Sequence, residues 1–168
     1  KNVVKCEFIL GLANLMSQTL GSGQQPQIMQ MTAEIIESMR KGNRGGVALM
    51  PHFTLYESLA ALPALYPDLP PLGAIFRPFG NPHLNRWIKT TRERFGYTLF
   101  SRKEGFREAL ATIRNGGWVT ILFDQNALYR GALIPFLGRV ASATDLPGIM
   151  AQKYSVPAAV AYADRTGF

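Results

Sequence analysis

The most informative part of this sequence is Val47-Ala48-Leu49-Met50-Pro51-His52-Phe53-Thr54-Leu55-Tyr56-Glu57. In this stretch the pattern predicts an apolar strand, then a turn, then a helix. His52 precedes Glu57 by five positions, and inside one helix the two side chains would point roughly 140° apart at about 100° per residue. We therefore expect His52 in the turn before the helix and Glu57 in the first helical turn. Strand ends that lead into helices are where α/β folds place their chemistry.

The residue types in this stretch predict acid–base catalysis. A neutral imidazole accepts a proton near neutral pH, and a carboxylate beside it orients the ring and stabilises its charged form. We predict that His52 is a general base and that Glu57 orients it, which is the pairing that makes a hydroxyl nucleophilic. The other histidine, His83, follows Asn81-Pro82 at the start of a predicted helix and is interpreted as structural.

Short apolar segments alternate with amphipathic ones along the rest of the chain, which predicts an α/β layered domain. We expect a central, mostly parallel or mixed sheet of about five strands flanked by helices. The predicted strands are 47–50, 72–76, 97–100, 118–123 and 156–163, and the predicted helices are 6–20, 26–41, 54–65, 82–95, 104–115 and 145–154. Residues 1–44 are expected to form an N-terminal helical segment and residues 45–168 the α/β core of a chain cut from a longer protein.

Composition limits the function classes. The 168 residues include 47% apolar and 17% charged residues, which is typical of a globular chain. With one cysteine and two histidines, an internal disulfide is excluded and a zinc site of the usual type is not expected. No run of apolar residues reaches the roughly 20 that a membrane span needs. The 18 basic and 11 acidic residues give a net charge of +7, which indicates acidic partners such as phosphates, anionic lipids or an acidic protein.

Four polar side chains stand just after predicted strands: His52, Arg77, Arg102 and Asp124. If the strands run parallel, these residues meet along the carboxyl edge of the sheet, which is the usual ligand-binding edge. For a single residue the alternative is an ordinary polar loop, but four together, one of them paired with Glu57, favour a functional site.

A basic run could form a surface for anions or only a solvated helix face. Trp87 and Phe95 lie between its charges, but helical spacing assigns both to the core, so stacking on RNA is not favoured. The run comprises Lys89, Arg92, Arg94, Arg102, Lys103 and Arg107.

Residues Gly45 to Arg165 contain a series of short motifs, whose order and spacing are informative together. The motifs are the stretch from Gly46 to Glu57, Phe76-Arg77-Pro78-Phe79-Gly80-Asn81-Pro82, Arg92-Glu93-Arg94-Phe95-Gly96, Ser101-Arg102-Lys103-Glu104-Gly105, Gly116-Gly117, Asp124-Gln125-Asn126, Ile134-Pro135-Phe136-Leu137-Gly138-Arg139 and Ala143-Thr144. In this order of motifs the chain resembles the lipid A biosynthesis (lauroyl/myristoyl) acyltransferases, a branch of the lysophospholipid acyltransferase superfamily. That family often has a second acidic residue where this chain has Asn126.

The resemblance implies transfer of a fatty acyl chain from acyl carrier protein to a hydroxyl of a phosphorylated lipid A precursor. It further implies an enzyme without a cofactor or metal, acting at the cytoplasmic face of the bacterial inner membrane. His52 and Glu57 would then be catalytic, and Arg77, Arg92, Arg102 and Asp124 would bind substrate.

Three alternatives remain open from the residues alone. One is an acyl-CoA-dependent acyltransferase for a glycerophospholipid or glycolipid, since both donors present the same pantetheine arm. Another is a non-catalytic module that binds anionic lipid or an acidic protein. Nucleic-acid binding rests on charge alone, would show a steep salt dependence and would give His52 no role.

Overall fold

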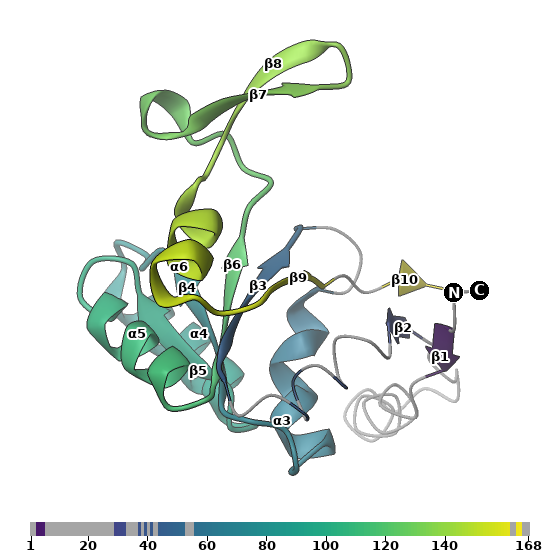
Figure 1. The fold of residues 1–168 in the computed structure, drawn as a ribbon. Helices are drawn as coiled ribbons and strands as arrows, with labels where there is room; N and C mark the ends of the chain where they lie inside the picture. Colours follow the sequence, from purple (N-terminus) through teal and green to yellow (C-terminus); the bar gives the residue numbers. More distant parts are fainter. Residues whose placement is uncertain are drawn as a thin grey trace.

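A computed structural model of the chain describes residues 3–5, 29–32, 37, 39, 41, 44–52, 56–161 and 164–165. Its centre is a five-stranded parallel sheet in the order β5-β4-β6-β3-β9 (Figure 1). The prediction of an α/β layered domain is therefore confirmed. The strands are β3 (Gly46–Met50), β4 (Leu72–Phe76), β5 (Thr98–Ser101), β6 (Trp118–Leu122) and β9 (Ala158–Val160).

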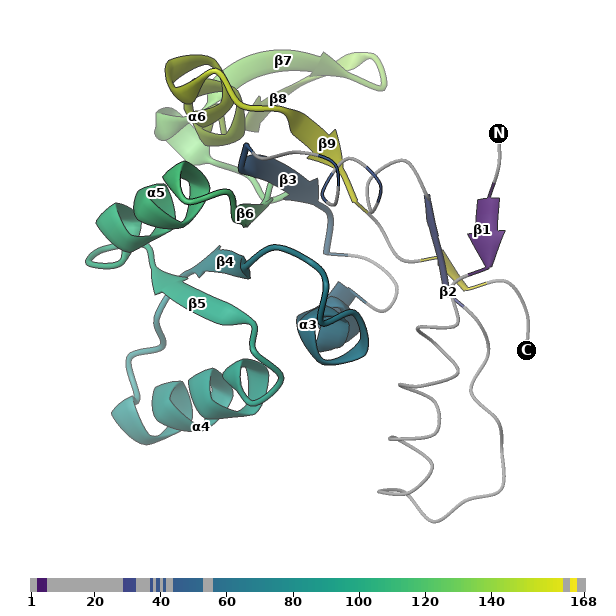
Figure 2. The same cartoon turned by 60° about the horizontal axis from the view of Figure 1, so that its bottom comes forward.

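Helical elements cover both faces of this sheet, as Figures 1 and 2 show. On one face lie α5 and α6, whose Ile113 and Met150 pack with Val47 and Val119 of the sheet. On the other face lie η1 and α3. The helical elements beside the sheet are η1 (Tyr56–Ala61), α3 (Leu62–Leu65), α4 (Pro82–Glu93), α5 (Phe106–Arg114) and α6 (Leu146–Tyr154).

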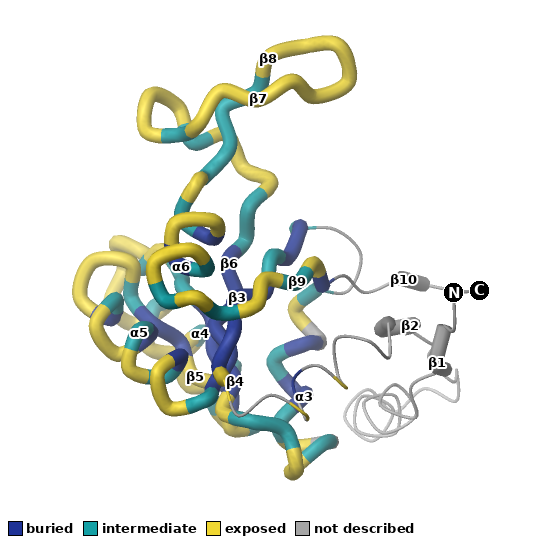
Figure 3. The backbone as a smooth tube through the Cα atoms, viewed as in Figure 1, coloured by how far each residue is buried: buried dark blue, intermediate teal, exposed yellow. Residues whose placement is uncertain are grey.

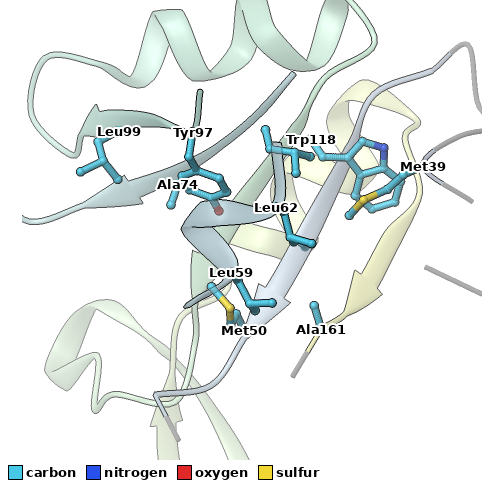
Figure 4. Close-up of a cluster of buried hydrophobic side chains, with 11 residues drawn as sticks. Met39, Met50, Leu59, Leu62, Ala74, Tyr97, Leu99, Trp118 and Ala161 are labelled. Atoms are coloured by element: carbon cyan, nitrogen blue, oxygen red, sulfur yellow. The ribbon is translucent and has the colours of Figure 1, made fainter. Parts of the chain in front are cut away.

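The second face carries the larger of the two buried clusters, drawn in Figure 4. Leu59 of η1 and Leu62 of α3 pack there against Met50 and Trp118. Successive strand residues alternate between the two faces, so Val47 and Val119 belong to one cluster while Met50 and Trp118 belong to the other. Because both faces are covered, the central strands are continuous apolar runs.

One hydrogen bond crosses this apolar layer. The buried Tyr97 hydroxyl donates to Thr120 Oγ1 over 2.9 Å. Burial raises the pKa of Tyr97 to about 12, because the phenolate would be desolvated there. The pair satisfies two polar groups that would otherwise be costly inside a core.

The limits of the helical elements beside the main sheet agree with the sequence pattern, with small shifts at the ends. The Asn81 side chain caps α4 by accepting hydrogen bonds from the backbone N–H groups of His83 and Leu84, at 2.9 and 3.2 Å. Past its C-terminus, Gly96 takes a positive φ of 88°. The helix predicted over 54–65 is present in its described part, 56–65, as a 3₁₀ segment followed by one turn of α-helix.

The prediction that Trp87 packs in the core is wrong. Trp87 is 65% exposed and its neighbour on α4, Leu84, is 43% exposed. The reason is the place of α4, which lies beside the edge strand β5 and covers little of the sheet (Figure 2). Phe95, at the other end of the apolar stripe, is half-buried.

Two smaller sheets were not predicted. β2 (Met29–Thr32) pairs antiparallel with β1 (Val3–Lys5) and β10 (Asp164–Arg165), where a helix was expected over 26–41. The sequence Met29-Gln30-Met31-Thr32 alternates apolar and polar residues, which is the period of a strand. The described residues Glu37, Met39 and Lys41 are helical, while the helix predicted over 6–20 lies outside the described residues.

The other small sheet is a hairpin of β7 (Ala132–Phe136) and β8 (Arg139–Ala143). It stands clear of the main sheet in Figure 1, and Figure 3 shows that most of it is exposed. Within the described part of the chain, no helix is both long enough and apolar enough to cross a membrane.

Candidate active site

The register of two neighbouring strands brings His52 and Asp124 together. β3 and β6 pair in parallel with Met50 opposite Leu122, and each polar residue lies two positions beyond that pair. A contact between Phe123 N–H and the Met50 carbonyl, 3.3 Å long, carries the pairing past the strand ends. Pro51 is buried and ends the strand, so His52 enters the turn as predicted.

The two side chains form a close pair. His52 Nδ1 lies 2.6 Å from Asp124 Oδ1, and the His52 backbone N–H donates to Oδ2 of the same carboxylate over 2.7 Å. Because an ionised carboxylate only accepts, Nδ1 is assigned as the protonated nitrogen. Nε2 then carries the lone pair, which is the state that a general base requires.

The ionisation of Asp124 suits this arrangement. Partial burial acts to raise the pKa of its carboxyl group, but the hydrogen bonds from His52 act in the opposite direction and outweigh burial. The net pKa lies below the ordinary value of 3.8, so the carboxylate is negative at neutral pH. A negative carboxylate on Nδ1 stabilises the imidazolium that forms when Nε2 takes a proton.

Glu57 does not take the position beside the ring that the sequence predicted for it. It lies in the first turn of η1, as expected, but its carboxylate binds Arg92 of α4 in a two-pronged ion pair. Arg92 Nε donates to Oε2 over 2.9 Å, and an Nη donates to Oε1. The parallel register of β3 and β6 places Asp124 at Nδ1 of His52. The predicted pair of His52 with Glu57 is therefore replaced by two separate pairs, His52–Asp124 and Glu57–Arg92.

Two further residues that were not singled out contact the His52 ring. Tyr56 meets it edge to face, with 5.2 Å between ring centroids and 68° between planes. Partial burial raises the pKa of Tyr56, and the hydrogen bond and charge of the adjacent Glu57 raise it further. Gln125 places its amide nitrogen 3.5 Å from Nε2, at the limit of a hydrogen bond. In the sequence, Tyr56 directly precedes Glu57 and Gln125 directly follows Asp124. This adjacency to predicted site residues was the signal that could have identified them.

Arg77 and Arg102 stand where they were expected, directly after β4 and β5, and both are exposed. The sheet order puts β4 two strands and β5 three strands from β3. At about 4.8 Å per strand, these arginines begin about 10 and about 14 Å from the backbone of His52. Among the described residues there is no cluster of three or more potential metal ligands.

Comparison with known proteins agrees with this geometry. A sequence profile of the family described as bacterial lipid A biosynthesis acyltransferase matches residues 13–167. The chain belongs to this family. The resemblance drawn from the ordered motifs is thereby confirmed.

The chain is similar to curated lipid A acyltransferases in alignments of 128 positions, which cover 69% of this chain. The lipid A biosynthesis myristoyltransferase of Escherichia coli K12 and the lipid A biosynthesis acyltransferase 1 of Shigella flexneri are each 31% identical to it. The lipid A biosynthesis acyltransferase 2 of Shigella flexneri is 28% identical. The matched region spans 39% of the length of the first two relatives and 40% of the third.

Proposed function

We propose that this chain is the catalytic part of an acyltransferase that moves a fatty acyl chain from acyl carrier protein to a hydroxyl of a lipid A precursor. The observation that carries the proposal is the His52–Asp124 pair, 2.6 Å apart at the carboxyl ends of two adjacent parallel strands. Membership of the bacterial lipid A biosynthesis acyltransferases supports the reaction class, and the names of the three relatives support a lipid A precursor as the acceptor.

In the proposed reaction, Nε2 of His52 removes the proton of the acceptor hydroxyl while the oxygen attacks the thioester carbonyl. The new ester C–O bond and the C–S bond coexist in a tetrahedral oxyanion. When the C–S bond breaks, the imidazolium returns its proton to the leaving thiolate, so His52 ends neutral. No covalent acyl-enzyme is needed, and Asp124 orients the ring and stabilises its charged state throughout.

Glu57 keeps a supporting role in this proposal. By binding Arg92 it holds η1 against α4. Two of the five guanidinium N–H donors of Arg92 are used in that pair. Within the part of the chain that the structure describes, the other donors of Arg92 have no hydrogen-bond acceptor, and we assign them to an anionic group of the substrate.

Arg77 and Arg102 are proposed to bind phosphate groups of the acceptor. The backbones of Arg77 and Arg102 lie about 10 and about 14 Å from that of His52, two and three strands away at about 4.8 Å each. A phosphorylated glycolipid is large enough to reach both the base and these distant cations. Arginine suits this task because its planar guanidinium binds phosphate in two-pronged fashion.

The donor, the membrane site and the partners follow from the same proposal. Acyl carrier protein is acidic and complements the net charge of +7, and the lipid acceptor places the reaction at the cytoplasmic face of the inner membrane. Acyl-CoA is the competing donor, and a glycerophospholipid is the competing acceptor. Parallel assays with acyl carrier protein and CoA thioesters of the same chain length separate the two donors.

The test uses the full-length protein with a lipid A precursor dispersed in detergent, and compares wild type with His52→Ala. We expect turnover to fall by roughly 100-fold or more in the variant with unchanged folding, because the general base is lost. Undiminished transfer by His52→Ala would refute the base. No transfer by wild type, with retained binding of anionic lipid in both proteins, would favour the non-catalytic binding module.

A further inference from the structure

The β7–β8 hairpin exposes an apolar surface that the proposed chemistry does not use. All five residues of β7 are exposed, and β8 carries a further exposed valine. Two large apolar residues in the segment that leads into the hairpin, Leu128 and Tyr129, are exposed as well. The most exposed apolar side chains of this region are Leu128, Tyr129, Leu133, Phe136, Leu137 and Val140, at 61% to 88% of their full area.

The tip of the hairpin carries leucine where a polar residue is preferred. Phe136 pairs with Arg139, so Leu137 and Gly138 form a two-residue loop, and their φ angles are 49° and 75°. Such turns favour Asn-Gly or Asp-Gly, because asparagine and aspartate tolerate a positive φ better than leucine does. Leu137 is nevertheless 88% exposed. Leu137 is unfavourable here because of its positive φ and because its apolar side chain is exposed to water. Such a residue indicates that the tip makes a contact with another surface.

Both faces of the hairpin are apolar. Cross-strand partners share a face, so Phe136 lies on one side, and Val140, opposite Pro135, lies on the other with Leu133. An ordinary solvated hairpin would show a polar face. A flat protein surface would cover one face only, whereas a fluid interface surrounds both.

The charges of this segment have one sign. Between Gln125 and Thr144 there are two arginines, Arg130 and Arg139, and no acidic residue. The guanidinium of Arg130 lies over the ring of Tyr129, with 5.5 Å from Cζ to the centroid. A cation held on an aromatic ring beside apolar side chains is suited to the zone between lipid headgroups and acyl chains.

We propose that the β7–β8 hairpin docks on an anionic lipid surface and holds the carboxyl edge of the main sheet against it. The segment that leads into the hairpin begins at Asp124, and the hairpin itself, from Ala132, rises from the same edge of the sheet as the His52–Asp124 pair (Figure 1). A lipid acceptor would then meet the base without leaving its membrane. The open backbone edges of a two-stranded hairpin confine it to the interface, since unpaired N–H and C=O groups are not tolerated in the hydrocarbon layer. This inference rests on the proposed function for its acceptor, but lipid binding is measurable without turnover.

The experiment measures binding of the full-length protein to vesicles of phosphatidylethanolamine with phosphatidylglycerol, and to vesicles of phosphatidylcholine alone. The apolar variant is Phe136→Ser with Leu137→Asn, and asparagine is the residue that the turn prefers. We expect this variant to bind both vesicles roughly tenfold or more weakly. Its matched control is Leu84→Ser, an exposed leucine on α4 away from the hairpin (Figure 2). The control should bind like wild type.

The charge variant, Arg130→Gln with Arg139→Gln, keeps the apolar residues. We expect it to lose roughly fivefold in binding for each charge removed, on the anionic vesicles only. Unchanged binding in both hairpin variants would overturn the proposal. A lower melting temperature of the apolar variant, with vesicle binding retained, would instead show that another part of the full-length chain covers the hairpin.

Turnover separates this proposal from the proposed function. Hairpin variants should transfer acyl chains normally to an acceptor dispersed in detergent and poorly to an acceptor embedded in vesicles. If wild type transfers no acyl chain in detergent, the proposed function fails while the binding comparison still tests the hairpin. Equal loss of turnover in detergent and in vesicles would refute a docking role, because it would place the hairpin in the chemistry.

Discussion

Replacing Asp124 by asparagine should slow acyl transfer far more than replacing Glu57 by glutamine. The carboxylate of Asp124 lies 2.6 Å from Nδ1 of His52, whereas Glu57 binds Arg92. An asparagine amide is uncharged, so it stabilises the imidazolium less, and its nitrogen can also favour the wrong ring tautomer. Both substitutions preserve side-chain volume, so any difference in turnover reflects the partner of the base.

The size of the effect follows from the exposure of the pair. In fully enclosed triads the same change costs about 10⁴-fold in turnover. Here the His52 and Asp124 side chains are 27% and 32% exposed, and water replaces part of the lost interaction. We therefore expect a loss of roughly 100-fold, which is about 2.7 kcal/mol of transition-state stabilisation. The exposed Glu57–Arg92 pair contributes about 0.5 to 1 kcal/mol to stability, and its loss should leave turnover within roughly fivefold of wild type.

The assay is turnover of full-length wild type, Asp124→Asn and Glu57→Gln at saturating donor and acceptor, with thermal unfolding as the control for folding. A pH–rate profile adds a second readout, because the loss in Asp124→Asn should persist at every pH at which the wild-type carboxylate is ionised. A 100-fold loss in Glu57→Gln, with Asp124→Asn close to wild type, would refute the reasoning. The acting partner of His52 would then be Glu57.

Three further expectations concern stability and use thermal or urea unfolding. Folding lowers the pKa of Asp124, so the ionised carboxylate stabilises the fold above pH 3.8, the ordinary pKa of the group, and this stabilisation is lost as the pH falls further. The Asp124→Asn variant should not show this loss of stability at low pH. The pKa of Tyr97 is raised to about 12, so stability should fall as pH rises from 10 toward 12, by about 3 kcal/mol at most, and Tyr97→Phe should remove that fall. Thr120→Val leaves the buried Tyr97 hydroxyl without its partner and should lower the free energy of unfolding by about 1 to 3 kcal/mol; an unchanged value would mean that the 2.9 Å contact contributes nothing.

The sequence was informative wherever a local signal had one physical meaning. Apolar runs identified the central strands, because the strands of a parallel sheet covered on both faces read as short continuous apolar segments. Asn81 and Gly96 marked the ends of α4 through capping chemistry that is local by nature. The place of His52 in a turn followed from helical geometry alone.

Local signals failed where exposure depends on what lies next to an element. Trp87 belongs to an apolar stripe, yet α4 lies at the sheet edge and leaves it 65% exposed. Met29–Thr32 forms a strand where a helix was predicted, because pairing with distant β1 and β10 decides its conformation. The β7–β8 hairpin had only the weak signal of Leu137-Gly138, since leucine is an unusual residue for such a turn.

By itself the sequence determined the fold class, the family, and a candidate base at a strand end, because each depends on the order and spacing of residues along the chain. Which carboxylate meets that base was decided by the tertiary structure. Strand order is a non-local property, and placing β6 next to β3 in parallel register brings Asp124 to His52 from 72 residues away. Glu57, only five residues from His52, is held instead by Arg92 on α4.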